Sequence, residues 1–324
     1  MENVNQAITG ICTFGKYPIC TDLDNLDANF AVIGVPFDSN VAFIPGSRLA
    51  PRRIREASTQ YGRGELGFYN YETDEQLLES PKIVDCGDVD ILSGQHKYSF
   101  TRVESAVRKI IQKHAVPVVL GGDHSITIPY GFALSEIHEK VDIVQIGAHL
   151  DWTDHAGSFY ESPGSAMRRL SEMDHIGHIT QIGIRGMGSS CKKDFYDAMA
   201  YGTALISAKS IHKLEREKVL EKIPNAKKYC MVIDIDGFDI SIAPGTSAPY
   251  PGGISFDEYV DIIIGLCQKG NVVGICLTEV NPQYDPSGIT SRLAALVLIN
   301  SIAQIIKYEC VATLQEQSGA KANG

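Results

Sequence analysis

The chain has 324 residues, of which 44% are apolar and 21% are charged, and its formal net charge is −10. This balance is typical of a globular protein of enzyme size and excludes a disordered, collagen-like or coiled-coil chain. The excess of acidic over basic residues argues against a nucleic-acid-binding surface. No apolar run approaches the roughly 18 residues of a membrane span, so we expect no membrane partner.

Short apolar segments alternate with longer amphipathic ones along the chain. The expected strands are residues 30–35, 83–85, 116–120, 143–146, 179–184, 204–206, 230–235 and 272–278. The expected helices are residues 51–57, 101–113, 129–140, 192–200, 211–222, 256–268 and 291–308. Because the strands are apolar throughout and do not alternate, we expect a parallel sheet covered on both faces. About eight β-α units with right-handed crossovers predict a single three-layer α/β/α domain with a mostly parallel eight-stranded sheet.

We expect this domain to occupy residues 30–310, with an N-terminal extension over residues 1–29 and a flexible C-terminal tail over residues 311–324. The N-terminus carries Glu2 and lacks the basic and then apolar pattern of a secretory signal. The eight cysteines form no C-x-x-C pair. Both features favour a cytoplasmic protein with reduced thiols.

Polar side chains follow four of the expected strands. The four segments are Gly-Gly-Asp-His-Ser at 121–125, Gly-Ala-His-Leu-Asp at 147–151, Asp-Ile-Asp-Gly-Phe-Asp at 234–239 and Thr-Glu-Val-Asn-Pro at 278–282. Ligands of parallel α/β sheets bind beyond the carboxyl ends of the strands. The four segments can therefore bring two histidines, three aspartates and a glutamate to one edge of the sheet.

Histidine and carboxylate side chains together suit a divalent cation such as Mn, Ni, Fe or Zn. Asp234 and Asp236 are two residues apart, so on a regular strand both side chains face the same way. The same spacing separates His149 and Asp151, so each pair can straddle a metal ion. Singly, each residue also has an ordinary structural role, such as an aspartate that caps a helix. Their shared placement on strand ends favours a metal site, and bound metal activates water for hydrolysis.

At these positions the sequence resembles the ureohydrolases, the family of arginases and agmatinases, and most closely the agmatinase branch. Further matching motifs are Gly-Val-Pro-Phe-Asp at 34–38, Pro-Gly-Ser-Arg at 45–48, Asp-Cys-Gly-Asp at 85–88 and Ala-Pro-Gly-Thr at 243–246. The resemblance implies an arginase-like fold, a dinuclear Mn or Ni centre and a trimer or hexamer. It also implies a hydrolase of C–N bonds in linear amidines, which releases urea from a small cationic guanidino substrate.

Matched by position, the resemblance implies a set of five metal ligands: His124, His149, Asp151, Asp234 and Asp236. Asp234 matches the carboxylate that bridges the two ions. Glu279 matches the acidic residue that grips the guanidinium group, which fits a charge-assisted bidentate hydrogen bond. We therefore expect Glu279 and Asp151 at the catalytic centre.

Two positions depart from the family pattern. The family's second motif reads Asp-Ala-His-x-Asp, and Gly147 stands where its first aspartate would bridge the ions. Glycine has no ligating atom, so each ion loses one bond. Pro163 precedes Gly164 where active relatives often carry a histidine that donates a proton. We expect up to two Mn or Ni ions per site, with incomplete occupancy in this chain.

The interpretation of Gly147 stays open at this stage. We favour a degraded metal site in one subunit of a heteromer that also contains an intact paralogue. The agmatinase-like biguanide (metformin) hydrolases look like a group built in this way. One alternative is a fully active homo-oligomer in which water or another carboxylate completes the site. Others are a purely structural or regulatory subunit, and a substitution introduced to inactivate an active enzyme. The loops at 153–166 and 186–191 are expected to select the substrate.

Overall fold

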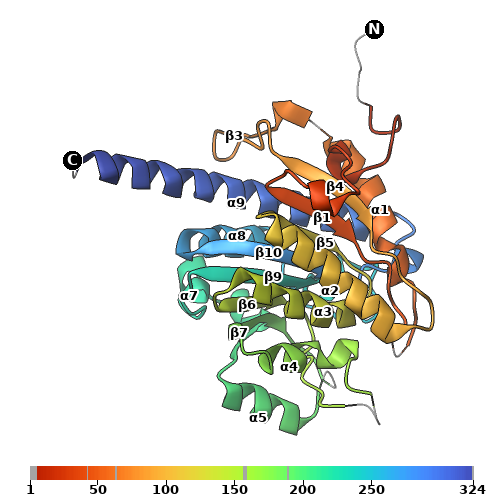
Figure 1. Cartoon of the computed structure of the whole chain (residues 1–324). Helices are drawn as coiled ribbons and strands as arrows, with labels where there is room; N and C mark the ends of the chain where they lie inside the picture. The colour runs from red at the N-terminus through yellow and green to blue at the C-terminus, as the bar shows by residue number, and fades with distance from the viewer. Residues whose placement is uncertain (1–5, 42, 63, 156–158, 188–189, 323–324) are drawn as a thin grey trace.

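The computed structural model describes residues 6–322, apart from residues 42, 63, 156–158 and 188–189. Eight parallel strands form one sheet in the order β4-β1-β5-β10-β9-β6-β7-β8 (Figure 1). Their bounds are β1 Phe30–Gly34, β4 Ile83–Asp88, β5 Val116–Leu120, β6 Val141–Ile146, β7 Ile176–Ile184, β8 Ala204–Ser207, β9 Lys228–Asp234 and β10 Asn271–Thr278. All the expected strands lie in this sheet, so the predicted parallel eight-stranded sheet is confirmed.

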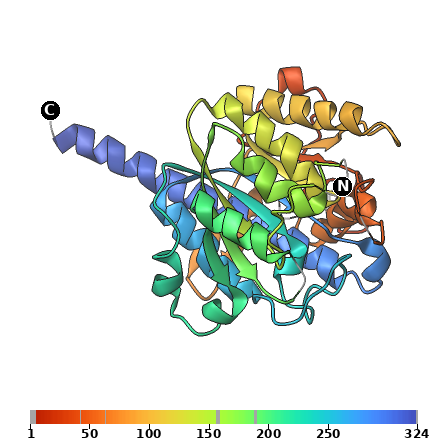
Figure 2. The same cartoon turned by 90° about the horizontal axis from the view of Figure 1, so that it is seen from below.

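Helices cover both faces of the sheet (Figures 1 and 2). Their bounds are α1 Ala50–Ser58, α2 His96–Gln112, α3 Thr127–Ala133, α4 Ala166–Ser171, α5 Lys192–Tyr201, α6 Ala208–Ile211, α7 Arg216–Leu220, α8 Phe256–Lys269 and α9 Ile289–Ala322. Successive strand residues point to opposite faces. Val118 accordingly packs in one core with α1, α8 and α9, and Val119 packs in the other with α2, α3 and α4.

Several local elements differ from the sequence-based expectation. The expected helix over 211–222 is divided into α6 and α7, because Glu215 is extended and begins a new helix. The helix α4 was not expected, since its six residues are too few to show a helical period. A short antiparallel pair, β2 (Phe68–Asn70) and β3 (Glu75–Leu77), lies outside the main sheet.

Part of the expected N-terminal extension packs on the domain, whereas the C-terminal part of α9 projects away from it (Figure 1). Within the extension, Phe14 is fully buried and its backbone N–H donates to Asp85 Oδ2 at 2.7 Å. At the other end, α9 continues as a helix through Ala322, over residues 311–322 where the sequence predicts a flexible tail. Seven of these twelve residues are alanine, glutamine, glutamate or lysine, which favour helix.

One helix of the described residues is long and apolar enough to cross a membrane by length and composition alone. It is the segment Ile289–Tyr308 of α9. Of its most apolar window, 72% is buried inside the protein. This burial is that of a core helix, and it places α9 against α1 and α8 as part of the layer behind the sheet.

Candidate active site

The central four strands of the sheet are β5, β10, β9 and β6, and their carboxyl ends are neighbours. His124 follows β5, Glu279 follows β10, Asp234 ends β9 and Asp151 follows β6. All four residues are buried, with at most 8% of their surface exposed. The structure thus brings together side chains that are up to 155 residues apart in the chain.

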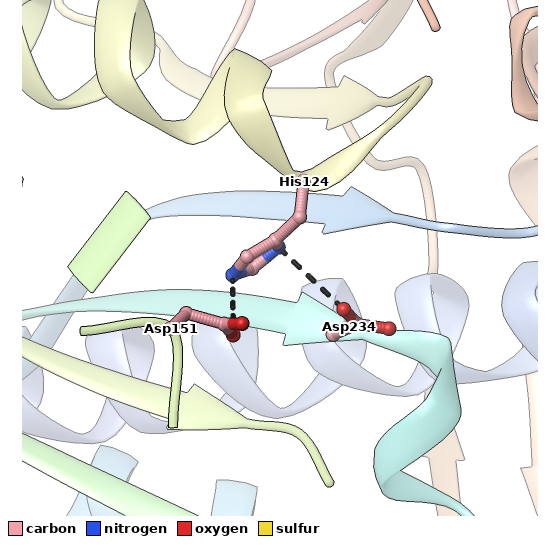
Figure 3. A group of neighbouring side chains, drawn as sticks. All are labelled: His124, Asp151 and Asp234. Carbon is pink, nitrogen blue, oxygen red and sulfur yellow. Dashed lines mark ion pairs between the residues drawn. The ribbon is translucent and has the colours of Figure 1, made fainter. Parts of the chain in front are cut away.

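Three of the five predicted metal ligands form a compact group. One ligand atom from each of His124, Asp151 and Asp234 lies within 4.8 Å of the others (Figure 3). The His124 ring sits between the two carboxylates, 3.5 Å from Asp151 Oδ2 and 3.8 Å from Asp234 Oδ2. Burial away from water raises the pKa of both carboxyl groups, and the nearby charge of Asp236 adds to the rise in each.

Hydrogen bonds indicate which nitrogen of the His124 ring carries the proton. Its Nδ1 lies 2.8 Å from Thr278 Oγ1, which itself donates to the backbone carbonyl of Ile233. The Thr278 hydroxyl therefore accepts a hydrogen bond from Nδ1–H, which makes Nε2 the unprotonated ring nitrogen. Burial lowers the pKa of His124, which favours this neutral form. Neutral imidazole with its second nitrogen anchored is the form in which histidine binds metals.

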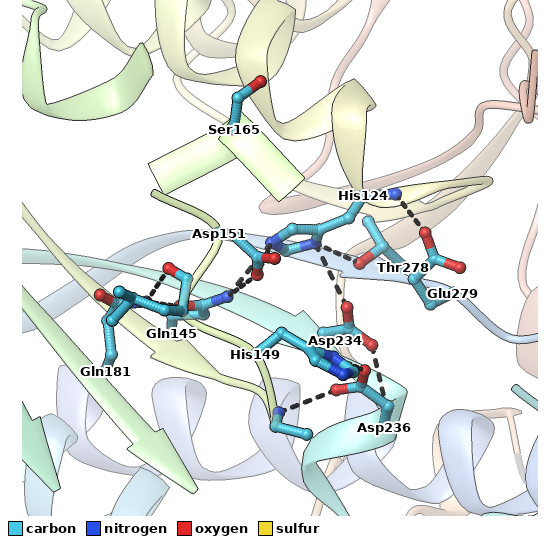
Figure 4. A network of polar contacts seen from close by, with 12 residues as sticks. His124, Gln145, His149, Asp151, Ser165, Gln181, Asp234, Asp236, Thr278 and Glu279 are labelled. Carbon is cyan, nitrogen blue, oxygen red and sulfur yellow. Dashed lines mark hydrogen bonds and ion pairs between the residues drawn. The ribbon is translucent and has the colours of Figure 1, made fainter. Parts of the chain in front are cut away.

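The other two predicted ligands are paired with each other. His149 Nδ1 lies 2.7 Å from Asp236 Oδ2, and Asp236 Oδ1 accepts a hydrogen bond from the Ala148 backbone at 2.9 Å (Figure 4). Burial opposes the charged form of His149, but the hydrogen bond and the charge of Asp236 outweigh it and raise the pKa of His149 to about 9. This ion pair joins His149 Nδ1 to Asp236 Oδ2, and neither residue belongs to the compact group.

The regular-strand geometry expected for Asp234 and Asp236, and for His149 and Asp151, is not present at these positions. Asp234 is the last residue of β9, and Asp236 lies in the 3-10 turn that follows. His149 and Asp151 both follow β6 in a loop, and Asp151 has a left-handed backbone with φ of 56°. The alternation of a regular strand therefore does not apply, and only one member of each pair joins the compact group.

Gly147 leaves one side of this group without a carboxylate. Its φ lies outside the left-handed region, so the backbone suits an L-residue as well as glycine. A Cβ added at this position would lie 3.1 Å from Gln145 Nε2 and 3.6 Å from Asp234 Cβ. A side chain at position 147 would therefore point toward the ligand group, into space next to the Gln145 amide.

Gln145 and Gln181 are polar residues of the site that the sequence interpretation missed. Gln145 Nε2 donates to Asp151 Oδ2 at 2.9 Å, and Gln181 Nε2 donates to Gln145 Oε1 (Figure 4). Both side chains are fully buried. The available signal was a glutamine between apolar residues near the carboxyl end of a strand, once in β6 and once in β7.

Glu279 lies next to the ligand group and outside it. Its Oε1 accepts a hydrogen bond from the His124 backbone N–H at 2.7 Å. Burial, and then the nearby charge of Asp123, raise the pKa of Glu279 well above its ordinary value. Its backbone is left-handed, with φ of 66°. Such a conformation is costly for a glutamate and typically persists at functional sites.

The segment around Pro163 lies next to the turn that carries His124. Pro163 begins a 3-10 turn, and the Gly164 carbonyl accepts a hydrogen bond from the Thr153 backbone at 2.9 Å. Residues 156–158 and 188–189, in the two loops expected to select the substrate, lie outside the described residues. Position 163 is a proline, so no histidine side chain is present there to donate a proton.

The donor set fits one divalent ion. A neutral imidazole and two carboxylates match the nitrogen and oxygen ligands that Mn, Ni or Zn prefer. A model of the arginase family matches residues 28–303. The chain belongs to the arginase family. This membership confirms the predicted resemblance to the ureohydrolases, a family that typically binds divalent metal.

Arginase-family relatives are similar along nearly the whole chain. Human mitochondrial guanidino acid hydrolase is 34% identical over 309 residues, which cover 93% of this chain and 85% of that protein. Guanidinobutyrase of Pseudomonas aeruginosa is 34% identical over 299 residues, covering 89% and 90%. The structure of proclavaminate amidino hydrolase from Streptomyces clavuligerus has a TM-score of 0.79 at 26% identity, covering 92% and 98%.

Proposed function

We propose that this chain is a metal-dependent hydrolase that cleaves a C–N bond in a guanidino or biguanide compound and releases urea. The observation that carries the proposal is the buried carboxylate of Glu279 beside three buried metal donors. A buried carboxylate is costly to ionise alone, and a guanidinium ion would stabilise its charge through a bidentate hydrogen bond. The names of the relatives, guanidino acid hydrolase and guanidinobutyrase, support this substrate class.

The chain's own residues have distinct roles in this proposal. His124, Asp151 and Asp234 would hold a Mn or Ni ion, which when bound activates water for attack on the guanidino carbon. Thr278 holds the His124 ring with its Nε2 lone pair free. The His124 backbone N–H fixes one oxygen of Glu279, so the other oxygen remains for the cationic group of the substrate.

Urea release tests the proposal directly. The purified chain, supplied with Mn²⁺ or Ni²⁺, is incubated separately with 4-guanidinobutyrate, agmatine, arginine, guanidine and a biguanide. We expect metal-dependent urea release from at least one of them, by the chain alone or with a co-expressed arginase-family paralogue. Absence of urea from every substrate under both conditions contradicts the proposal.

The metal content is expected to be lower than two ions per chain. Gly147 supplies no ligand, and the His149–Asp236 ion pair must break before a second ion can bind. Fewer anionic ligands weaken the binding of divalent ions. Elemental analysis after extensive dialysis measures the retained stoichiometry, and two tightly held ions per chain would refute this prediction.

The same two features favour a second candidate function. In a heteromeric ureohydrolase, a trimer or hexamer, this chain would stabilise an intact paralogous subunit and contribute little turnover itself. Size-exclusion chromatography of the co-expressed pair, with activity assayed in each peak, distinguishes this candidate from a self-sufficient enzyme. Full activity in a peak that contains this chain alone excludes the supporting role.

A further inference from the structure

Two successive hydrogen bonds, from Trp152 to Gln181 and from Gln181 to Gln145, determine which way the Gln145 amide faces. The Trp152 indole N–H, which can only donate, lies 2.8 Å from Gln181 Oε1. The amide nitrogen of Gln181 therefore points the other way, toward the Leu150 carbonyl at 2.8 Å and toward Gln145 Oε1. With its oxygen engaged there, Gln145 presents its NH2 group to the candidate metal site (Figure 4).

The NH2 group of Gln145 contacts one possible ligand atom on each of two residues of the ligand group. Gln145 Nε2 lies 2.9 Å from Asp151 Oδ2 and 3.2 Å from His124 Nε2. Because Thr278 engages His124 Nδ1, the Nε2 lone pair is free to accept this contact. An amide NH2 carries two donors, so it can satisfy the carboxylate and the imidazole together. These are two of the three donors in the ligand group.

The position of Gln145 depends on Gly147. The two residues are two apart at the end of β6, and a Cβ on Gly147 would lie 3.1 Å from Gln145 Nε2. Such a contact is tight enough that the amide would have to move. The absence of a side chain at position 147 therefore allows the Gln145 amide to lie beside the ligand group.

We propose that Gln145 is an internal competitor for the metal: its NH2 group joins Asp151 to His124 and must withdraw before a divalent ion binds there. The inference rests on the proposed function only in assuming that an ion binds at this site. Gln145 acts as a positioning residue, held in its competing orientation by Gln181 and Trp152. It lowers the metal affinity of the chain and adds to the effect of the missing ligand at Gly147.

Metal titration of a Gln145 variant tests this role. Gln145→Met keeps the length of the side chain and removes both donors. We expect the apo variant to bind Mn²⁺ about tenfold or more tightly than the unaltered chain, because a buried hydrogen bond to a charged group no longer competes. The matched control is Gln112→Met, which removes a surface amide that donates to Glu136 at 3.0 Å. The control should leave Mn²⁺ affinity unchanged in isothermal titration calorimetry.

A second measurement needs no variant. Trp152 is the only tryptophan of the chain, so its fluorescence reports on the hydrogen bond to Gln181. If Gln145 withdraws when the ion binds, the emission maximum should shift on Mn²⁺ addition, with the midpoint found by calorimetry. An unshifted maximum during saturable Mn²⁺ binding overturns the proposal.

The outcomes separate this inference from the proposed function. A folded Gln145→Met protein with Mn²⁺ affinity equal to or below that of the unaltered chain overturns the competitor role and leaves a metal-dependent hydrolase possible. Failure of the unaltered chain, the variant and the control to bind Mn²⁺ at all contradicts both proposals. Tighter binding by Gln145→Met alone, together with the Trp152 shift, supports the competitor.

Discussion

The variant Glu279→Gln is expected to bind a guanidinium substrate more weakly by about 2–5 kcal/mol, which is the usual cost of losing one partner of a buried, hydrogen-bonded charge pair. Its metal content should stay unchanged, because Glu279 is not one of the three donors in the ligand group. The substituted amide can still accept the His124 backbone N–H through its oxygen, so the fold should persist. Substrate affinity and elemental analysis measure the two effects separately.

A surface variant controls for the loss of one negative charge. Glu139 is exposed and pairs with Lys228 at 2.8 Å, so Glu139→Gln should alter neither substrate affinity nor metal content. Unchanged substrate binding and turnover in an isolated, active Glu279→Gln chain would show that Glu279 does not contact the substrate. If this chain only supports a paralogue, Glu279→Gln should leave the turnover of the complex intact, whereas the matching change in the paralogue should abolish it.

The variant Gly147→Asp is expected to raise metal affinity by about tenfold or more and to create or increase urea release. The added carboxylate supplies the ligand that the family motif contains, and divalent ions bind more tightly as anionic ligands are added. The backbone at position 147 suits an L-residue, and the new Cβ points toward the ligand group. The only tight contact is with the far end of the Gln145 side chain, which can turn aside.

Gly147→Asn separates charge from crowding in this experiment. It has the shape of the aspartate variant and meets Gln145 in the same way, but it adds no negative charge. We expect it to gain only the metal affinity that follows from moving the Gln145 amide, less than Gly147→Asp gains, and no urea release over the unaltered chain. A folded Gly147→Asp protein that holds two ions and releases no urea from any guanidino compound would show that the defect lies elsewhere, with Pro163 as the first position to restore.

Apolar patterning along the chain predicts the sheet and the segments that carry the site. Uninterrupted apolar runs identify buried parallel strands because both faces of such a sheet are covered, and each run ends where polar residues begin. His124, Asp151, Asp234 and Glu279 could therefore be assigned to strand ends before any coordinates were known. The antiparallel pair β2–β3 and the short helix α4 left no comparable pattern, because they are too short to show a period.

How these side chains combine depends on long-range packing that no local sequence pattern specifies. The strand order makes β5, β10, β9 and β6 neighbours, a pairing between distant segments that no local pattern encodes. Beyond the strands the backbone loses its alternation, so Asp151 turns toward His124 while His149 turns toward Asp236. The direction of the Gln145 amide is likewise settled by Gln181 on another strand, because the orientation of a buried amide depends on which donors and acceptors surround it.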